Sequence, residues 1–171
     1  MDVKLYGDGI HDDTAAIQSM LDKRGIVTVD APGTYLISKA LIIRSGTRLV
    51  LSPGTKLMCA PMSRCSLIEN EHFAGGGTDR NIEIVGGIWD GNCDEMGLDG
   101  ETFTLSRLDT PWSPESFRGK LMRFCHVDGI RIMGLTVRNP VSYGIQIGAS
   151  YGFAVRDICF DYNHHFGTAN P

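Results

Sequence analysis

The sequence predicts an all-β fold, a right-handed parallel β-helix (a solenoid) whose N-terminal end is capped by an α-helix. Three observations support this prediction. The chain has one strong helix signal, near its start, and short strand patterns follow it as far as residue 162. Glycine is abundant, with 21 residues in a chain of 171, against an average of about 7%, which indicates many tight turns. Late in the chain the apolar pattern of positions 122–137 repeats at positions 145–160.

The capping helix is expected over residues 12–24. Asp12 or Asp13 can cap its first turn, because a carboxylate accepts hydrogen bonds from free backbone N–H groups and is favoured at the positive end of the helix dipole. The apolar residues that share one face are Ala16, Ile17, Met20 and Leu21. Gly25 follows as a left-handed stop. A helix cap also explains the pair of aspartates better than acid–base catalysis does.

Short strands separated by glycine or proline are expected after the helix. They lie at residues 26–29, 34–37, 41–43, 47–51, 55–58 and 67–68, two more lie between 81 and 89 on either side of Gly86 and Gly87, and others run from 121 to 162. Residues 91–118 interrupt the pattern with acidic residues and prolines. We expect this segment to form a long irregular insertion.

The internal repeat is the most informative feature of the chain. The matched apolar pairs, all at one constant offset, are Met122/Ile145, Phe124/Ile147, Ile130/Phe153, Ile132/Val155, Leu135/Ile158 and Val137/Phe160. A period that holds three short alternating strands fits one coil of a parallel β-helix, in which every second side chain points inward. Ile82 also precedes Ile130 by nearly twice this offset, which we interpret as two periods.

A leucine-rich repeat is the alternative fold at this period. Residues 155–163 fit its template, but Pro140 stands where the preceding repeat needs an asparagine. The rest of each period also lacks helical spacing. The β-helix is therefore the better interpretation.

Composition narrows the classes of function. The 16 Lys and Arg residues against 20 Asp and Glu residues give a net charge of −4, so we expect neither nucleic acid nor an anionic membrane surface as a partner. No apolar run approaches the ~20 residues of a membrane span. The five cysteines are odd in number and lack a Cys-x-x-Cys motif, which disfavours a disulfide framework or a zinc site. We expect no metal and no cofactor.

Three segments carry a family resemblance. Residues 6–18 read YGDGIHDDTAAIQ, residues 32–37 read PGTYLI and residues 86–92 read GGIWDGN. They resemble the GDGxxDDTxAIQ, PGTY and GGxxDGN segments of the pectin-lyase-like β-helix superfamily. The resemblance covers nearly the whole chain outside the insertion and implies one domain over residues 1–171. It is specific for the fold, because hydrolases, lyases, epimerases and phage tailspikes share this superfamily.

The later coils look most like polygalacturonase-like family 28 glycoside hydrolases, in which two such coils lead into an Asn-Thr-Asp-Gly segment. Asn170 matches the first residue of that segment, and Pro171 replaces the threonine. The resemblance places the catalytic aspartates after Pro171, so we expect the chain to be the N-terminal part of a longer protein and inactive alone. It implies inverting hydrolysis of an acidic, pectin-type polysaccharide. It also implies a secreted or periplasmic protein, although residues 1–171 show no signal peptide.

Four residues are candidates for substrate binding. Asn170 follows the family motif, and His164 and His165 directly precede the coil that would hold the active site. Adjacent strand residues point to opposite sides, so only one of the two histidines could line a sugar groove. Trp112 lies in the insertion and could stack on a sugar ring, because loops on a rigid scaffold often carry binding residues. An ordinary structural role is the alternative for each.

Two other functions stay open. One is a non-catalytic carbohydrate-binding or structural β-helix, of the phage spike or adhesin type. The other is a polysaccharide lyase, which would need a base to remove a C5 proton, often with calcium, and the sequence shows no convincing cluster for either. The last coil would leave Phe153, Val155, Ile158 and Phe160 without a coil stacked on them. We therefore expect self-association through this uncapped end.

Overall fold

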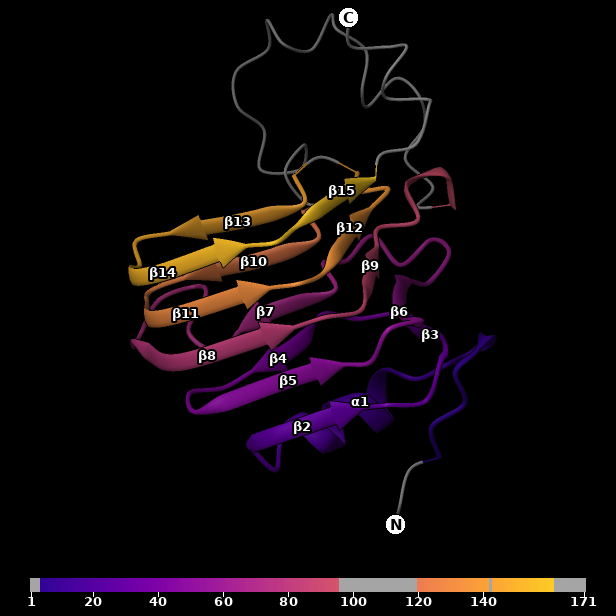
Figure 1. The fold of residues 1–171 in the computed structure, drawn as a ribbon, viewed down its shortest axis with the longest axis horizontal. Coiled ribbons are helices and arrows are strands. Elements are labelled where there is room, and N and C mark those ends of the chain that lie inside the picture. Colours follow the sequence, from indigo (N-terminus) through magenta and orange to yellow (C-terminus); the bar gives the residue numbers. More distant parts are fainter. Residues whose placement is uncertain (1–3, 96–119, 142, 162–171) are drawn as a thin grey trace, which may run out of the picture.

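The computed structural model of the protein describes residues 4–95, 120–141 and 143–161. It is a right-handed parallel β-helix with a helix at the N-terminal end (Figure 1), as the sequence predicted. The strands are β1 (Asp8–Asp12), β2 (Gly25–Val29), β3 (Gly33–Ile37), β4 (Leu41–Ile43), β5 (Thr47–Leu51), β6 (Thr55–Cys59), β7 (Ile68–Asn70), β8 (Asp79–Val85), β9 (Ile88–Asp90), β10 (Met122–Cys125), β11 (Val127–Met133), β12 (Thr136–Arg138), β13 (Ile145–Gly148), β14 (Tyr151–Arg156) and β15 (Cys159–Asp161). The described helices are α1 (Thr14–Leu21) and the 3₁₀ turn η1 (Cys93–Glu95).

Three parallel sheets form the sides of the described solenoid. The six-stranded sheet has the order β1-β3-β6-β9-β12-β15, the five-stranded sheet β14-β11-β8-β5-β2 and the four-stranded sheet β13-β10-β7-β4. Each coil from β4 onward visits the four-stranded, the five-stranded and then the six-stranded sheet. Neighbouring strands of one sheet therefore come from successive coils, which stack from the N-terminal end at the bottom of Figure 1 to β15 at the top.

The internal repeat found in the sequence is one coil of this stack. Ile130 in β11 is aligned with Phe153 in β14, and the pairs β10–β13 and β12–β15 have the same offset. Ile130 is also aligned directly with Ile82 in β8. The longer offset from Ile82 to Ile130 is thus one coil, and its interpretation as two periods was wrong. The segment between β9 and β10, which contains the expected insertion at 91–118, supplies the extra length, and its residues 96–119 lie outside the described ranges.

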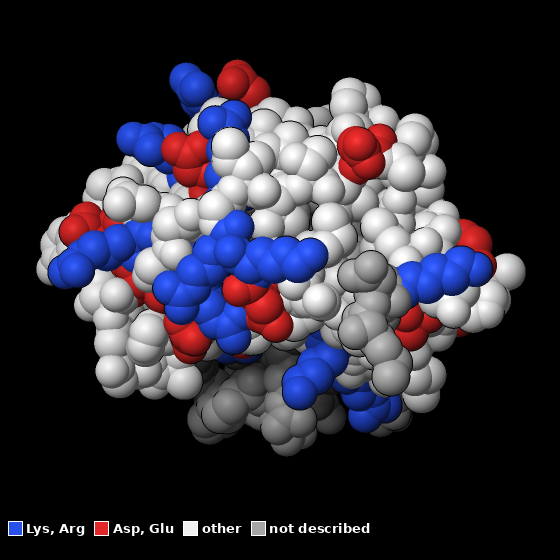
Figure 2. Space-filling model, turned by 90° about the horizontal axis from the view of Figure 1, so that it is seen from below, with Lys and Arg blue, Asp and Glu red and all other residues white. Residues whose placement is uncertain are grey.

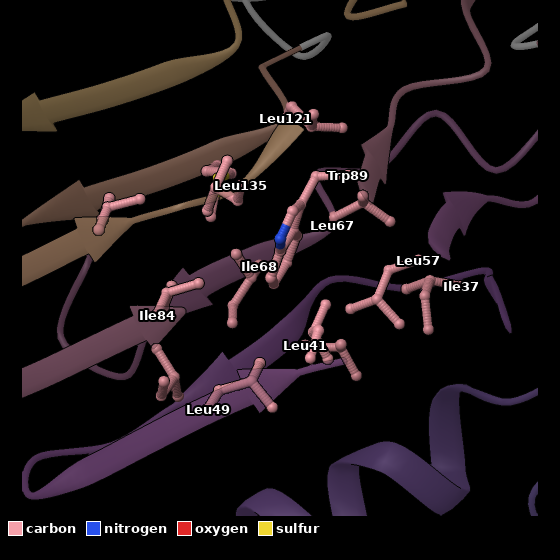
Figure 3. Close-up of a cluster of buried hydrophobic side chains, with 14 of the residues drawn as sticks. Ile37, Leu41, Leu49, Leu57, Leu67, Ile68, Ile84, Trp89, Leu121 and Leu135 are labelled. Atoms are coloured by element: carbon pink, nitrogen blue, oxygen red, sulfur yellow. The ribbon is translucent and has the colours of Figure 1, made fainter. Parts of the chain in front are cut away.

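A continuous apolar core runs along the axis. Leu57, Trp89 and Val137 occupy equivalent positions in β6, β9 and β12, and all three are buried. Figure 3 shows the Trp89 ring inside the solenoid beside Ile68. The indole N–H donates to the carbonyl oxygen of Gly86 at 3.1 Å, so burial of this ring leaves no polar group unpaired. The burial of apolar side chains that stack between coils is the main source of the folding free energy.

The helix α1 covers the first coil. Its apolar residues Ala16, Ile17 and Leu21 are buried, as expected. The helix runs from Thr14 to Leu21 and is shorter than the predicted 12–24. Asp22 caps it in a helical conformation, the N–H groups of Lys23 and Arg24 then bond three residues back, and Arg24 turns left-handed with a φ of 58°. Gly25, expected as the left-handed stop, has a φ of 69°.

Only part of the capping prediction is confirmed. Asp12 accepts a hydrogen bond from the backbone N–H of Thr14, the first helical residue, at 2.9 Å. Asp13 occupies the cap position, but its side chain makes no capping bond to the helix. It turns instead toward the preceding loop and accepts from the N–H groups of Tyr6 and Gly7. Asp13 thus ties the segment before β1 to the start of the helix.

Charged side chains on the outer surface are paired across coils. In the five-stranded sheet Glu83 lies between Arg48 and Arg131, at 3.4 and 2.9 Å. Figure 2, which views the N-terminal end, likewise shows acidic and basic side chains intermixed rather than gathered in a patch of one sign. Such exposed pairs contribute little individually, but they keep this surface polar. No helix among the described residues is long and apolar enough to cross a membrane.

The last described coil exposes apolar side chains. Phe153, Val155 and Phe160, which continue the inward-facing columns of the previous coil, are 60%, 40% and 51% exposed. Ile158 is only partly buried. The expectation that these residues would lack a covering layer holds for the described part of the chain.

Candidate functional site

The candidate site lies on the outer face of the four-stranded sheet. The middle residue of β4 and of β7, and the second residue of β10 and of β13, form one row across this face. The row consists of Ile42, Glu69, Arg123 and Gln146. In β4, β7 and β10 the neighbouring residues point inward and are buried, so the alternation of the strands fixes the row on the outside.

Arg123 is held in place from two sides. Its Nη1 atom lies 2.9 Å from Oε1 of Glu69, and the two side chains are 26% and 20% exposed. The guanidinium carbon also lies 4.1 Å from the centre of the Phe73 ring, a cation–π contact. A partly desolvated ion pair of this kind is stronger than one in open water. The guanidinium is therefore oriented before any ligand arrives.

Two polar atoms in this row lack a hydrogen-bond partner. They are Nε of Arg123 and Oε1 of Gln146, both buried and unpaired within the described structure. Nearly all buried polar atoms in proteins are hydrogen-bonded, so unpaired ones need an explanation. Here a free N–H donor and a free carbonyl acceptor stand on aligned residues of β10 and β13. Because both atoms are covered, the part of the row that a ligand on the outer face can reach is the exposed fraction of the Arg123 and Glu69 side chains.

A second cation lies near the first. Lys120 precedes β10 and is 5% exposed. Burial lowers the pKa of its ammonium group, and the positive charge of Arg123 lowers the pKa further. Its Nζ atom lies 6.0 Å from the centre of the Tyr143 ring, which is 56% exposed. The cluster thus joins two cations, one carboxylate and an exposed aromatic ring, a combination suited to an anionic ligand with an apolar face.

A second polar cluster lies where β7 turns toward β8. The side chain of Asp79 is fully buried. Its Oδ1 atom accepts from Ser45 Oγ at 3.0 Å and lies 3.1 Å from His72 Nδ1. Its Oδ2 atom accepts from Asn70 Nδ2 at 2.7 Å and from the backbone N–H of His72 at 2.9 Å. Burial alone would raise the pKa of Asp79, but these hydrogen bonds outweigh it and hold the pKa below its usual range.

This cluster is an internal brace rather than a reaction site. Asn70 bonds to the backbone of Cys125 in the next coil through both ends of its amide, at 2.8 and 2.9 Å. The ligand atoms of Glu71, His72 and Asp79 lie within 4.8 Å of one another, a spacing that could hold a metal ion. Glu71 is already paired with Arg44, however, and both oxygens of Asp79 are occupied. The network joins three successive coils.

The carboxylates of the 6–18 motif are also used for structure. Asp8 accepts hydrogen bonds from the backbone N–H groups of His11 and Ile10. These bonds, together with a hydrogen bond to the His11 side chain, lower the pKa of Asp8 to about 2. Asp12 accepts hydrogen bonds from Thr14 and from Ser38, which directly follows β3. Asp13 is fully buried with the bonds described above. None of the three faces the row on the four-stranded sheet, so the motif builds the fold.

The sequence candidates and the structural candidates do not coincide. Asn170, His164, His165 and Trp112 all lie outside the described residues, so their roles stay predictions. Sequence reasoning did not single out Arg123, Gln146 or Lys120. A signal was available, because positions 123 and 146 are one period of the internal repeat apart and are polar residues between inward-facing apolar ones.

Comparisons with known proteins agree on the architecture. A structure described as a "putative glycosyl hydrolase", from Parabacteroides merdae, superposes with a TM-score of 0.71 at 16% identity, over 92% of this chain and 71% of that one. The pre-mature gene product 12 of bacteriophage phi29 superposes with a TM-score of 0.66 at 18% identity, over 87% of this chain and 20% of that one. At such identities the likeness concerns the fold alone.

Sequence comparison identifies the family. No curated protein matches the chain in sequence. The family model described as rhamnogalacturonase A/epimerase, pectate lyase-like matches residues 1–101, more than half of the chain. That stretch contains all three segments that suggested a pectin-lyase-like β-helix. The chain belongs to the rhamnogalacturonase A/epimerase, pectate lyase-like family.

Proposed function

We propose that this protein acts on an acidic polysaccharide of the pectin type, as an inverting glycoside hydrolase, and that the sugar chain lies along the outer face of the four-stranded sheet. The observation that carries the proposal is the row formed by Glu69, Arg123 and Gln146, in which the ion pair with Glu69 and the contact with Phe73 orient the Arg123 guanidinium. Membership of a pectate lyase-like family supports a carbohydrate as the ligand.

The charges of the site favour an acidic sugar over a neutral one. Arg123 places a partly exposed positive charge on this face of a protein whose net charge is −4. A uronic acid offers a carboxylate to the exposed part of the Arg123 guanidinium, a charge-assisted hydrogen bond. The exposed Tyr143 ring next to Lys120 provides a surface on which the apolar face of a sugar ring can rest.

In this proposal the described residues bind and orient the substrate. Inverting hydrolysis needs one carboxylic acid to protonate the leaving oxygen and one carboxylate to activate water on the opposite face, about 6.5–9.5 Å apart. Among the described carboxylates, those of Asp8, Asp12, Asp13 and Asp79 serve the fold. We therefore assign no catalytic acid or base to them. Glu69 positions Arg123.

Binding is tested by calorimetry with oligogalacturonate, and with neutral galactan of similar length as the control ligand. Arg123→Gln removes the cation and the free N–H, and should weaken oligogalacturonate binding about tenfold to a hundredfold, the loss of one charged hydrogen bond. The matched control is Arg131→Gln. Arg131 also pairs with a glutamate at 2.9 Å, but on the five-stranded sheet, and its substitution should leave binding unchanged.

A second variant separates charge from structural damage. Glu69→Gln keeps the shape of the row but removes its negative charge, so it should tighten oligogalacturonate binding while Arg123→Gln weakens it. Binding should also weaken as salt concentration rises. Equal binding of galactan and oligogalacturonate, or equal effects of Arg123→Gln and Arg131→Gln, would contradict the proposed site.

Product analysis tests the reaction. A hydrolase releases reducing ends without a new double bond, and inversion is read from the anomer that forms first. Unsaturated products would instead identify a polysaccharide lyase. Binding with no cleavage by the longest form of the protein would identify a carbohydrate-binding or structural β-helix.

A further inference from the structure

Two thiols meet at the corner between β6 and β7. Cys59 is the last residue of β6 and is 1% exposed, and Cys65 lies in the loop that follows and is partly buried. The Cys59 thiol lies 3.5 Å from the carbonyl oxygen of Cys65. The Cys65 thiol lies 3.8 Å from the carbonyl oxygen of Ile37, which is the residue aligned with Cys59 in the preceding coil. The Cys59 side chain and the Cys65 residue are therefore in direct contact.

The loop that brings them together has a defined path. Met62 and Arg64 adopt left-handed backbone conformations, with φ of 61° and 50°. Residues other than glycine adopt this conformation only when their surroundings impose it. The N–H of Met62 donates to the carbonyl oxygen of Glu95 at 2.7 Å, and that of Leu67 to Leu121 at 2.8 Å. The contact between the thiols is therefore a product of the fold rather than of a freely moving loop.

The two thiols differ in reactivity. Interaction with the neighbouring Cys59 thiol is the main cause that lowers the pKa of Cys65 to about 7. The same interaction and burial raise the pKa of Cys59. Near neutral pH a large fraction of Cys65 is thus the thiolate, which is the nucleophile in thiol–disulfide exchange. Cys59 is placed to react second.

We propose that Cys59 and Cys65 form a reversible disulfide that joins the end of β6 to the segment entering β7. The oxidant is a small-molecule disulfide such as oxidised glutathione. The Cys65 thiolate attacks one of its sulfur atoms and releases one glutathione thiolate, which takes up a proton. Cys59 then loses its proton and attacks Cys65 in the mixed disulfide, releasing the second glutathione. Two protein thiols are oxidised, and one disulfide is reduced to two thiols.

This inference is independent of the proposed reaction on carbohydrate. Its consequence is a covalent closure of the exposed loop that contains Arg64, at the corner from which β7 and Glu69 begin. Trypsin cutting after Arg64 would leave the reduced protein with two free ends. In the oxidised protein the two ends would stay joined.

The chain offers a direct mass-spectrometric test. Trypsin cuts after Lys56, Arg64 and Arg80, so Cys59 and Cys65 fall in separate peptides, 57–64 and 65–80. After incubation of the folded protein with oxidised glutathione, the non-reduced digest should contain these two peptides as one cross-linked species. The intact protein should lose two hydrogens, and dithiothreitol should restore them.

Variants and rates complete the test. Cys59→Ser should stop the reaction at glutathionylated Cys65, whereas Cys159→Ser, which removes an exposed thiol elsewhere, should leave the cross-link intact. In the wild type, the rate at which iodoacetamide labels Cys65 should reach half its maximum at about pH 7. A digest in which Cys65 carries glutathione but no cross-link to Cys59, or labelling of Cys65 that is slower than that of Cys159 at pH 7, would overturn the inference.

Discussion

Asp79 should be one of the least replaceable residues of this protein, and its two simplest substitutions should differ in effect. Asp79→Ala removes all four hydrogen bonds of the buried carboxylate. Asp79→Asn keeps the shape and one oxygen. The partners decide the outcome, because Asn70 Nδ2 and the His72 backbone N–H can only donate. Ser45 Oγ and His72 Nδ1 can also accept.

The magnitudes follow from this asymmetry. In Asp79→Asn the amide oxygen can face Asn70 and the His72 N–H while the amide nitrogen faces Ser45 Oγ and His72 Nδ1. The free energy lost is then only the extra strength that the negative charge gives to these hydrogen bonds, about 1–2 kcal/mol. Asp79→Ala leaves two N–H groups without an acceptor, one of the two on Asn70 Nδ2 and the backbone N–H of His72. Each costs about 2 kcal/mol, so we expect a loss of about 4 kcal/mol.

Denaturation by guanidinium chloride, followed by far-ultraviolet circular dichroism at pH 7, measures both losses. Asp128→Ala is the matched control, because Asp128 is an exposed aspartate of β11 whose nearest cation is 4.0 Å away, and it should not change the free energy of unfolding measurably. Equal losses for Asp79→Ala and Asp79→Asn would refute the reasoning from donors and acceptors. A loss for Asp79→Ala no greater than that of the control would refute the brace itself.

Three further predictions concern backbone contact, pH and the exposed end. Gly91→Ala should destabilise the protein by about 2 kcal/mol or more, because the new Cβ would lie 2.4 Å from the carbonyl oxygen of Asn139, whereas Gly148→Ala, whose Cβ would lie 3.6 Å from Cys125 Sγ, should be tolerated in thermal unfolding. Because the pKa of Asp79 is lowered in the folded state, the Asp79 carboxylate stabilises the fold above its unfolded pKa, about 4. This stabilisation is lost as pH falls through the folded pKa. The free energy of unfolding should therefore fall less from pH 5 to pH 3 for Asp79→Asn than for the wild type. Phe153→Lys should reduce self-association of residues 1–171 in sedimentation velocity, and a monodisperse wild-type monomer would contradict the role of the exposed end.

Much of the fold could be predicted because inward-facing residues repeat. The alternation of Met122 and Phe124, which recurs in Ile145 and Ile147, is a direct consequence of a coil whose every second side chain enters the core. The strand β1 (Asp8–Asp12) was not predicted. Its residues are mostly exposed and polar, so they show no alternation, and they form a strand only because β3 lies beside them. Long-range pairing of this kind leaves no local signal.

The candidate site was harder to predict, for a related reason. Outward-facing positions are free of packing constraints, so the repeat marks positions 123 and 146 only as polar, and Arg123 and Gln146 read as ordinary surface residues. Their meaning comes from alignment of β10 with β13 and from the unpaired atoms that this creates. The sequence attracted attention instead to Asp12 and Asp13, whose carboxylates bind backbone and hydroxyl groups.

The separation of the two sets of positions explains why the family motif identifies a fold and not a reaction. The carboxylates of residues 6–18 already accept hydrogen bonds from backbone N–H groups and from Ser38. A substitution among them would therefore damage the first coil whatever the protein's substrate. The row of Glu69, Arg123 and Gln146 could change entirely without disturbing the buried columns on the other side of the same strands. A stack of coils therefore lets the outer face of the four-stranded sheet evolve toward different ligands while the inner face stays fixed. For this chain, the substrate should be sought from the chemistry of that outer row rather than from the motif that names the family.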